Sequence, residues 1–384
     1  MAPESLSSRE RILRTLRGEG TDRIPIAPPI PWNIWDDIEG RKAQGWQAED
    51  SFQQVLALVR KHCDETARSR VLGTVGDRSQ LHCPSKCTKT VSTVRSNGRT
   101  TVTRVLHTPK GDLRTVIAMD AGVSTAWVVE PLVKDLDDVE KILSVPFEWG
   151  KPDMEAFRCE VERIGDRALM EIGISTPMVC VSHVMHFDTF LEWTVSERPT
   201  IERLIETVFE RIHEKLEYVL EHGAGPLFWI GGSEQATPPM MSPKLYDDFV
   251  VKYDSRLIEL IHKHGQYAHV HCHGKISGIF DRLLDMGVDA LDPVEPPPDG
   301  DIELAEAKRR SAGRMTLMGN IEFRHLEFAT RNEIDTMVRR TICEGPKDHM
   351  ILYPSATAIS RLSDRYRDNA IQYIESGLKY GGLE

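Results

Sequence analysis

Three histidines occupy alternate positions in one apolar segment of the chain. His269, His271 and His273 belong to the sequence AHVHCHG, in which Cys272 separates the last two. Alternate side chains of a β-strand point to the same face, so a strand here would place the three imidazoles together and Cys272 on the other face. Imidazole is a frequent ligand of zinc and iron, and it exchanges protons near neutral pH. The segment therefore predicts an active site that uses His271 and His273.

A carboxylate at the end of the preceding apolar segment could complete a metal site. Glu234 closes the sequence PLFWIGGSE. A catalytic metal takes about three protein ligands and keeps one position open. His271, His273 and Glu234 would supply a two-histidine, one-carboxylate set, which suits zinc or a similar divalent metal such as non-haem iron. The alternative is that the histidines act as acids, as hydrogen-bond partners of a substrate or as core residues.

Further polar and aromatic residues follow or end other apolar segments. Glu295 and Asp292 flank Pro293 in ALDPVEP, where a carboxylate could act as an acid or base or lie in a solvated loop. Glu322 ends the segment MTLMGNIE. We predict Glu295 as a third catalytic residue. The residues predicted to bind substrate are Trp32, His183, Trp229 and Asn320.

Apolar segments alternate with amphipathic segments from residue 130 onward. Such a train of strands and helices builds a parallel sheet with crossover helices. No G-x-G-x-x-G motif begins a predicted helix, so the sequence lacks the usual motif of an open dinucleotide-binding sheet. The number of strand–helix units favours a closed (β/α)8 barrel. Active-site residues of such barrels lie at the C-terminal ends of the strands. The predicted strands cover 168–176, 226–234, 267–274, 290–296, 315–322 and 349–356.

The N-terminal part of the chain has a different pattern. A helix is predicted over 5–18 and a short apolar strand follows it at Arg23. Thr and Val then alternate with polar residues over 88–128, with Asn97-Gly98 at a turn, which is typical of an antiparallel β-meander. We expect this meander to decorate the barrel as an insertion in one domain that covers residues 1–384.

Composition and charge exclude several classes of function. The chain has 384 residues, a net charge of -11 and 28% charged residues. An acidic chain without a basic stripe is a poor candidate for nucleic acid or an anionic membrane surface. No apolar run approaches the length of a membrane span or forms a secretory signal. We expect a cytoplasmic protein with a small-molecule substrate, and the sequence is compatible with a homodimer.

Three segments resemble the uroporphyrinogen decarboxylase superfamily. RERILRTLRGEGTDRIPI is similar to its first helix and strand, and SPKLYDDFVVKYDSRLIELIHKHG to the helix before its histidine strand. The stretch from AHVHCHG through GVDAL to MGNIEF resembles its central part, in which a His-x-Cys-Gly turn ends a strand. The resemblance implies an enzyme with the (β/α)8 fold.

The superfamily has two branches, and the chain resembles the methyltransferase-like one. The decarboxylase branch carries an arginine-rich motif near its N-terminus, whereas the equivalent APPIPWNIWDD has no arginine. The methyltransferase branch binds zinc through a His-x-Cys pair and a distant cysteine. Here His271 takes the histidine position, His273 takes the cysteine position, and the distant cysteine, expected near Ala356, is absent. A metal would therefore meet a harder nitrogen and oxygen set.

The resemblance implies a metal-dependent methyltransferase or demethylase. It would move a methyl group from a small methylated substrate to a corrinoid or a folate acceptor. The chain holds no corrinoid-binding segment, so a corrinoid would arrive on a separate protein. Two alternatives remain: a cofactor-independent decarboxylase or lyase of a small carboxylated substrate, in which a protonated His271 or His273 donates a proton, and a non-catalytic binding protein on a degraded barrel.

Overall fold

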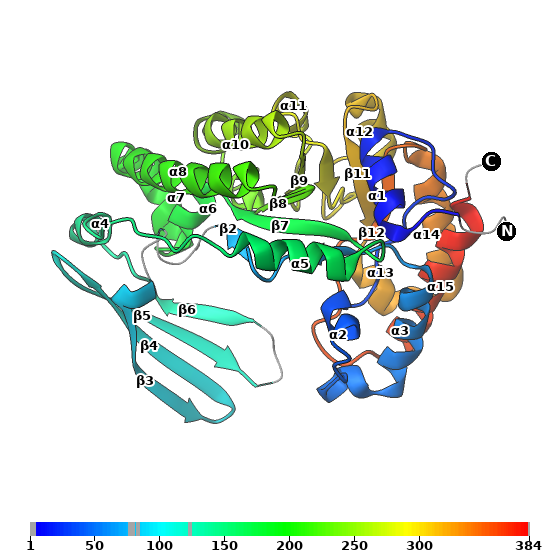
Figure 1. Ribbon diagram of the computed structural model, residues 1–384, viewed down its shortest axis with the longest axis horizontal. Coiled ribbons are helices and arrows are strands. Elements are labelled where there is room, and N and C mark those ends of the chain that lie inside the picture. The colour runs from blue at the N-terminus through cyan, green and yellow to red at the C-terminus, as the bar shows by residue number, and fades with distance from the viewer. Residues whose placement is uncertain (1–4, 76–80, 82–84, 122–124, 383–384) are drawn as a thin grey trace.

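A curled parallel β-sheet forms the centre of the protein (Figure 1). The computed structural model describes residues 5–75, 81, 85–121 and 125–382. The strand order is β1-β7-β8-β9-β10-β11-β12, and β2 pairs with β7. The strands are β1 (Thr66–Arg68), β2 (Thr74–Val75), β7 (Leu169–Ser175), β8 (Leu227–Gly231), β9 (Tyr267–His271), β10 (Ala290–Asp292), β11 (Thr316–Ile321) and β12 (Met350–Pro354).

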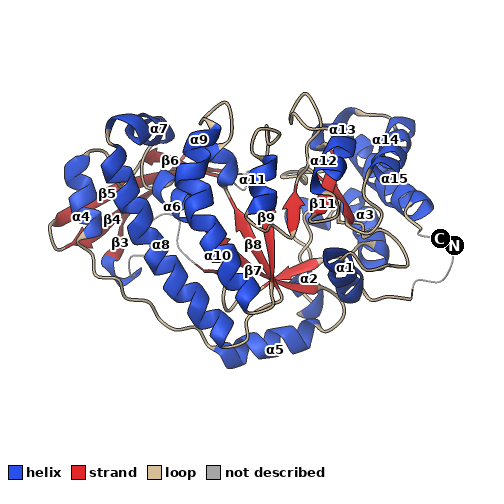
Figure 2. Cartoon of the chain, turned by 90° about the horizontal axis from the view of Figure 1, so that it is seen from above, coloured by secondary structure: helices blue, strands red, loops and turns tan. Residues whose placement is uncertain are grey.

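Helices connect successive strands and pack outside the sheet (Figure 2). Every residue of β7 and of β11 is buried, as expected for parallel strands that are covered on both faces. The α-helices are α1 (Ser8–Arg17), α2 (Ile34–Ile38), α3 (Asp50–His62), α4 (Leu136–Leu143), α5 (Met154–Ile164), α6 (Pro177–Ser182), α7 (Phe187–Ser196), α8 (Arg198–Glu221), α9 (Pro243–Tyr246), α10 (Lys252–Lys263), α11 (Phe280–Asp285), α12 (Leu304–Ser311), α13 (Phe323–Phe328), α14 (Arg331–Glu344) and α15 (Asp364–Tyr380).

The segment between α1 and α2 hydrogen-bonds at both edges of the curled sheet. Ala27 N donates to Leu352 O in β12, and Leu352 N donates to Pro25 O. On the other side, Asp64 N donates to Ile26 O just before β1. The curled parallel sheet is the type of sheet that the sequence predicts. Closure into a complete barrel stays a prediction, which these contacts favour.

A four-stranded antiparallel sheet covers the segment for which the sequence predicts a meander. It contains β3 (Thr88–Ser96), β4 (Arg99–Thr108), β5 (Gly111–Asp120) and β6 (Ala126–Glu130), paired in that order. Asn97 and Gly98, with φ of 50° and 76°, form the turn between β3 and β4, as a two-residue hairpin loop of this kind requires. The sheet projects from the parallel sheet in Figure 1. Within the part of the chain that the structure describes, no helix has the length and apolarity to cross a membrane.

A buried group of three charges ties the N-terminal elements to the sheet. Asp64, just before β1, accepts from Arg11 of α1 at 2.5 Å and from Arg23 at 2.5 Å. Its carboxylate also accepts from Ile26 N at 3.0 Å. The Asp64 side chain is 1% exposed, and the side chains of Arg11 and Arg23 are 2% and 6% exposed. The segment that contacts both sheet edges is therefore held in place by ion pairs shielded from water.

Replacement of this carboxylate tests the contribution of the buried charges to stability. We expect Asp64→Ala to lower the free energy of unfolding by about 3–5 kcal/mol, because buried Arg11 and Arg23 both lose their ion pair with Asp64, although Arg11 keeps its pair with Asp22. Denaturant unfolding followed by circular dichroism measures the change. Asp166→Ala is the matched control, since Asp166 pairs with Arg9 at 3.7 Å on the exposed surface. Equal stability of the two variants would contradict the expectation.

Candidate active site

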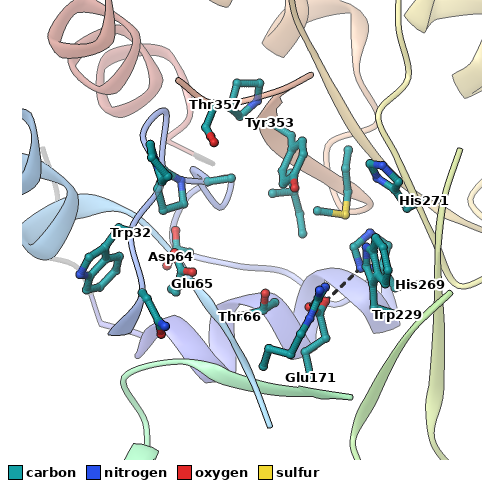
Figure 3. Close-up of a pocket in the computed structure, with 18 of the residues that line it drawn as sticks. Trp32, Asp64, Glu65, Thr66, Glu171, Trp229, His269, His271, Tyr353 and Thr357 are labelled. Carbon is teal, nitrogen blue, oxygen red and sulfur yellow. Dashed lines mark hydrogen bonds and ion pairs between the residues drawn. The ribbon is translucent and has the colours of Figure 1, made fainter. Parts of the chain in front are cut away.

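A pocket of about 750 Å³ opens where the C-terminal ends of the parallel strands meet. In Figure 3, Trp32, Asp64 and Glu65 lie on one side of the cavity, and Trp229, His269 and His271 lie on the opposite side. Its lining includes Trp32, Asp64, Glu65, Arg68, Arg70, Glu171, Trp229, His269, His271, His273, Tyr353 and Ala356. All three histidines predicted from the sequence therefore face one cavity, while Cys272 is fully buried outside it.

His269 is committed to two buried carboxylates. Its Nδ1 lies 3.3 Å from Glu171 Oε1, and its Nε2 lies 2.7 Å from Asp292 Oδ1. Burial opposes the charged imidazolium, but the charges and hydrogen bonds of Asp292 and Glu171 outweigh burial and raise the pKa of His269 to about 9. His269 is thus protonated at neutral pH, and both of its nitrogens are in use. It organises the site and has no nitrogen left for a metal or a substrate.

His271 and His273 each use one nitrogen for a carboxylate. His271 Nδ1 lies 2.9 Å from Asp292 Oδ2, and His273 Nδ1 lies 2.9 Å from Glu295 Oε1. A carboxylate only accepts, so Nδ1 donates in both pairs and Nε2 is left for other chemistry. Among the described residues none hydrogen-bonds either Nε2 atom. The two rings lie 4.6 Å apart, nearly perpendicular, at the pocket wall.

The end of β9 explains the different surroundings of these two histidines. The sequence predicts a strand over 267–274, whereas β9 ends at His271. Cys272 N still donates to Asp292 O, and the chain then turns at Gly274, whose φ is 83°. Gly274 N donates to Glu295 Oε2 at 2.6 Å. Hence Asp292 in β10 holds His271, and Glu295 in the following loop holds His273.

A second carboxyl group near His273 has an unusual pKa. Burial, and then the charge of Glu295, raise the pKa of Glu322 to about 7. Its Oε2 accepts from Ser355 Oγ at 3.1 Å, and its Oε1 is buried without a partner. The pKa of His273 is also above its ordinary value, because the bond to Glu295 and its charge outweigh the effect of burial. Both groups therefore keep their proton to a higher pH than usual, and His273, which lines the pocket, can act there as a proton donor.

Sequence reasoning missed the wall of the pocket that β1 contributes. Glu65 has a buried Oε2 without a partner, and burial, with the charges of Glu171 and Asp64, raises its pKa well above the ordinary value. Arg68 ends β1 and reaches Glu171 Oε2 at 3.0 Å. The strand has only three residues, too few for a periodic pattern, and the paired charges of ETAR gave no motif. The only feature of the sequence that pointed to this wall of the pocket was the density of charged residues around β1.

The structure brings together some of the predicted substrate-binding residues and not others. Trp32 and Trp229 line the pocket. Asn320 does not, because its Oδ1 accepts from Thr341 Oγ1 of α14 at 2.7 Å. His183 caps the C-terminal end of α6 as an exposed residue near Gln235, outside the pocket lining. Roles of His183 and Asn320 in substrate binding stay predictions, and this geometry does not support them.

The predicted metal ligands are not gathered as a compact set of three. Across residues 5–75, 81, 85–121 and 125–382, the one group of three candidate ligands within 4.8 Å is Asp135, Asp137 and Asp138. These begin α4, where the Asp135 side chain caps the helix by accepting from Asp138 N, which explains their proximity.

His271, His273 and Glu234 still offer features that fit a divalent metal. Imidazole ligands of metals usually donate their other nitrogen to a carboxylate, as His271 and His273 do here. Glu234, in the turn after β8, has a buried Oε2 without a partner. A metal at this set stays a prediction.

Comparisons with known proteins agree with the architecture. A family model described as uroporphyrinogen decarboxylase (URO-D) matches residues 115–356. Among solved structures, a methyltransferase from Methanosarcina mazei gives a TM-score of 0.61 at 15% identity, over 98% of this chain and 99% of that one. A B12-independent methionine synthase from a Shewanella species gives a TM-score of 0.43 at 12% identity, over 93% of each chain. No curated protein sequence matches the chain.

The charge state of His269 can be tested directly. We expect its imidazole to titrate near pH 9 in an NMR titration, and Glu171→Gln to lower that pKa because one of the two stabilising carboxylates is lost. A pKa raised in the folded state stabilises the protein fully below the unfolded value of about 6.5. This contribution to stability is lost as pH rises from there through about 9. Titration of His269 near pH 6.5 would refute the assignment.

Proposed function

Because the chain belongs to the uroporphyrinogen decarboxylase family, we propose that it is a methyltransferase-like enzyme of that family. It takes a methyl group from a small methylated substrate and passes it to a separate acceptor, a corrinoid protein or a folate. The observation that carries the proposal is the pair of Nε2 atoms of His271 and His273, oriented at the pocket by Asp292 and Glu295. The fold shared with the methyltransferase from Methanosarcina mazei supports it.

The chain's own residues meet the requirements of demethylation at the substrate heteroatom. When the bond from carbon to oxygen, nitrogen or sulfur breaks, the methyl carbon goes to the acceptor and the electron pair stays on the heteroatom. That atom then needs a proton, which His273 can supply because its pKa is raised. Glu295 holds the His273 ring during this transfer.

A divalent metal would take the place of the proton in this chemistry, because Nε2 of His273 cannot carry a proton and bind a metal at the same time. If zinc or a similar ion is held by His271, His273 and Glu234, it supplies a Lewis acid at the same heteroatom. The nitrogen donors are oriented for such a role, and the buried oxygen of Glu234 has no partner within the described part of the chain. This ligand set is harder than a thiolate set, and it favours an oxygen or nitrogen leaving group.

The proposal includes three further points on architecture and setting. The sheet closes into a complete (β/α)8 barrel, with the segment that contains Ile26 completing the ring between β12 and β1. Residues 1–384 act as one domain, in which 88–128 is an insertion. The enzyme works in the cytoplasm, and a corrinoid would come to it on another protein.

A decarboxylase of a small carboxylated substrate is the second candidate. The observation that favours it is that His273, whose pKa is raised, lines the same pocket as Arg68, an arginine that can hold a carboxylate. The carbon–carbon bond to the carboxylate would break, carbon dioxide would leave, and the electron pair would stay on the remaining carbon. This carbanion would then take a proton from His273. No methyl acceptor takes part in this reaction.

The requirement for an acceptor separates the two reactions. We expect purified enzyme to remove methyl groups from a panel of methyl ethers, methylamines and methyl thioethers only when methyl-accepting cob(I)alamin or tetrahydrofolate is added. Mass spectrometry of the substrate follows methyl loss, and a parallel panel of small carboxylic acids, incubated without an acceptor, is assayed for release of carbon dioxide. Release of carbon dioxide without an acceptor would replace the first proposal by the second.

Removal of the two imidazoles tests their role. We expect His271→Ala and His273→Ala each to lower the turnover rate by roughly 10²- to 10⁴-fold, the usual contribution of a positioned acid or base. Stoichiometric zinc, measured by mass spectrometry of the purified protein, should be lost from the double variant. His262→Ala is the matched control, since His262 is an exposed histidine of α10 that pairs with Asp289 away from the pocket. Metal that survives loss of both histidines would place the metal site elsewhere.

A further inference from the structure

We infer that Arg68 binds a carboxylate of the substrate, so that the enzyme acts on small carboxylic acids. The inference rests on the proposed function for the reaction, but the contacts of Arg68 alone carry the choice of ligand. Arg68 ends β1 and lines the pocket that holds His271 and His273. It lies outside the arginine-free stretch APPIPWNIWDD that precedes α3.

Most N–H donors of the Arg68 guanidinium have no hydrogen-bond partner among the described residues. Its side chain is 47% exposed, and one nitrogen donates to Glu171 Oε2 at 3.0 Å. Among the described residues no other group hydrogen-bonds this guanidinium. Arginine carries five N–H donors in a planar fork, whose geometry matches a carboxylate bound by two parallel hydrogen bonds. Arg70, the other arginine at the pocket wall, is by contrast already paired with Glu39.

The guanidinium of Arg68 packs against the indole of Trp229, which restricts its orientation. The Arg68 guanidinium lies 4.4 Å from the centre of the Trp229 ring, and Trp229 lies 5.2 Å from the ring of His271. The indole lies over Gly231, where a Cβ atom would come within 2.2 Å of the ring. A side chain at Gly231 would displace the indole. Trp229 therefore contacts both Arg68 and His271, so an anion bound to Arg68 would lie in the same pocket as the histidines proposed to react.

The charges around the pocket favour an anionic ligand. Glu171, which balances Arg68, is 5% exposed, and it also pairs with His269. Asp64 is held by two arginines, and burial, with the charges of Glu171 and Asp64, raises the pKa of Glu65. Arg68 is the more exposed group of this arrangement, whereas the carboxylates of Glu171 and Asp64, which also line the pocket, are almost completely buried and already paired. An acidic chain can therefore accept an acid at this position.

The experiment compares carboxylates with their amides. Isothermal titration calorimetry measures the binding of acetate and acetamide, benzoate and benzamide, and 4-methoxybenzoate and 4-methoxybenzamide. We expect wild-type protein to bind at least one carboxylate roughly 10- to 100-fold tighter than its amide, as a charge-assisted hydrogen bond implies. Arg68→Gln should abolish this preference. Arg158→Gln, which removes an exposed arginine of α5 paired with Glu155, should leave the preference unchanged.

The outcomes separate this inference from the proposed reaction. Absence of a preference in every wild-type pair, or a preference that survives Arg68→Gln, overturns the inference. If Arg68→Gln does not fold, Arg68→Lys is measured instead, and it should weaken the preference because the planar fork is lost. Carboxylate binding through Arg68 without methyl loss would overturn the proposed reaction alone. Methyl loss from neutral substrates that is unaffected by Arg68→Gln would overturn the inference alone.

Discussion

The buried carboxylate of Asp292 is the group on which the geometry of the pocket depends. It is 1% exposed, and it contacts His269 through one oxygen and His271 through the other. Burial alone would favour its neutral form, yet the charges of His271 and His269 hold the pKa of Asp292 well below its usual range. Removal of either imidazole would leave this buried charge with one partner fewer, and breaking a buried ion pair is strongly destabilising. The pairing of β9 with β10 and the orientation of His271 are thereby coupled.

From Asp292 a chain of alternating charges crosses the sheet. Arg68 of β1, Glu171 of β7, His269 of β9 and Asp292 of β10 follow one another, each in contact with the next. His271 ends the chain at the pocket. Parallel strands present equivalent positions at the same level, so residues far apart in sequence can form such a row. The row links a half-exposed guanidinium to an imidazole through groups that are almost completely shielded from water.

Much of this arrangement follows from local sequence pattern, and the rest does not. The alternation of histidines in AHVHCHG placed all three at one cavity, because the period of a strand is a local property. The regular helix and strand train after residue 130 likewise indicated the curled parallel sheet. The positions of Arg68 and Asn320 are decided by tertiary contacts. Arg68 belongs to a strand too short to leave a pattern, and Asn320 turns toward Thr341 of a helix that follows later in the chain.

The burial of Cys272 has a consequence for the reactivity of the strand that carries the histidines. Cys272 lies between His271 and His273 in the sequence, and its side chain is fully buried. Burial raises the pKa of its thiol to about 12. Of the two forms of a cysteine side chain, only the thiolate readily attacks electrophiles or is readily oxidised to a sulfenic acid. Alkylating agents and peroxide therefore meet imidazole, carboxylate and indole groups and the thioether of Met318 in this pocket, and no thiol among its described lining residues.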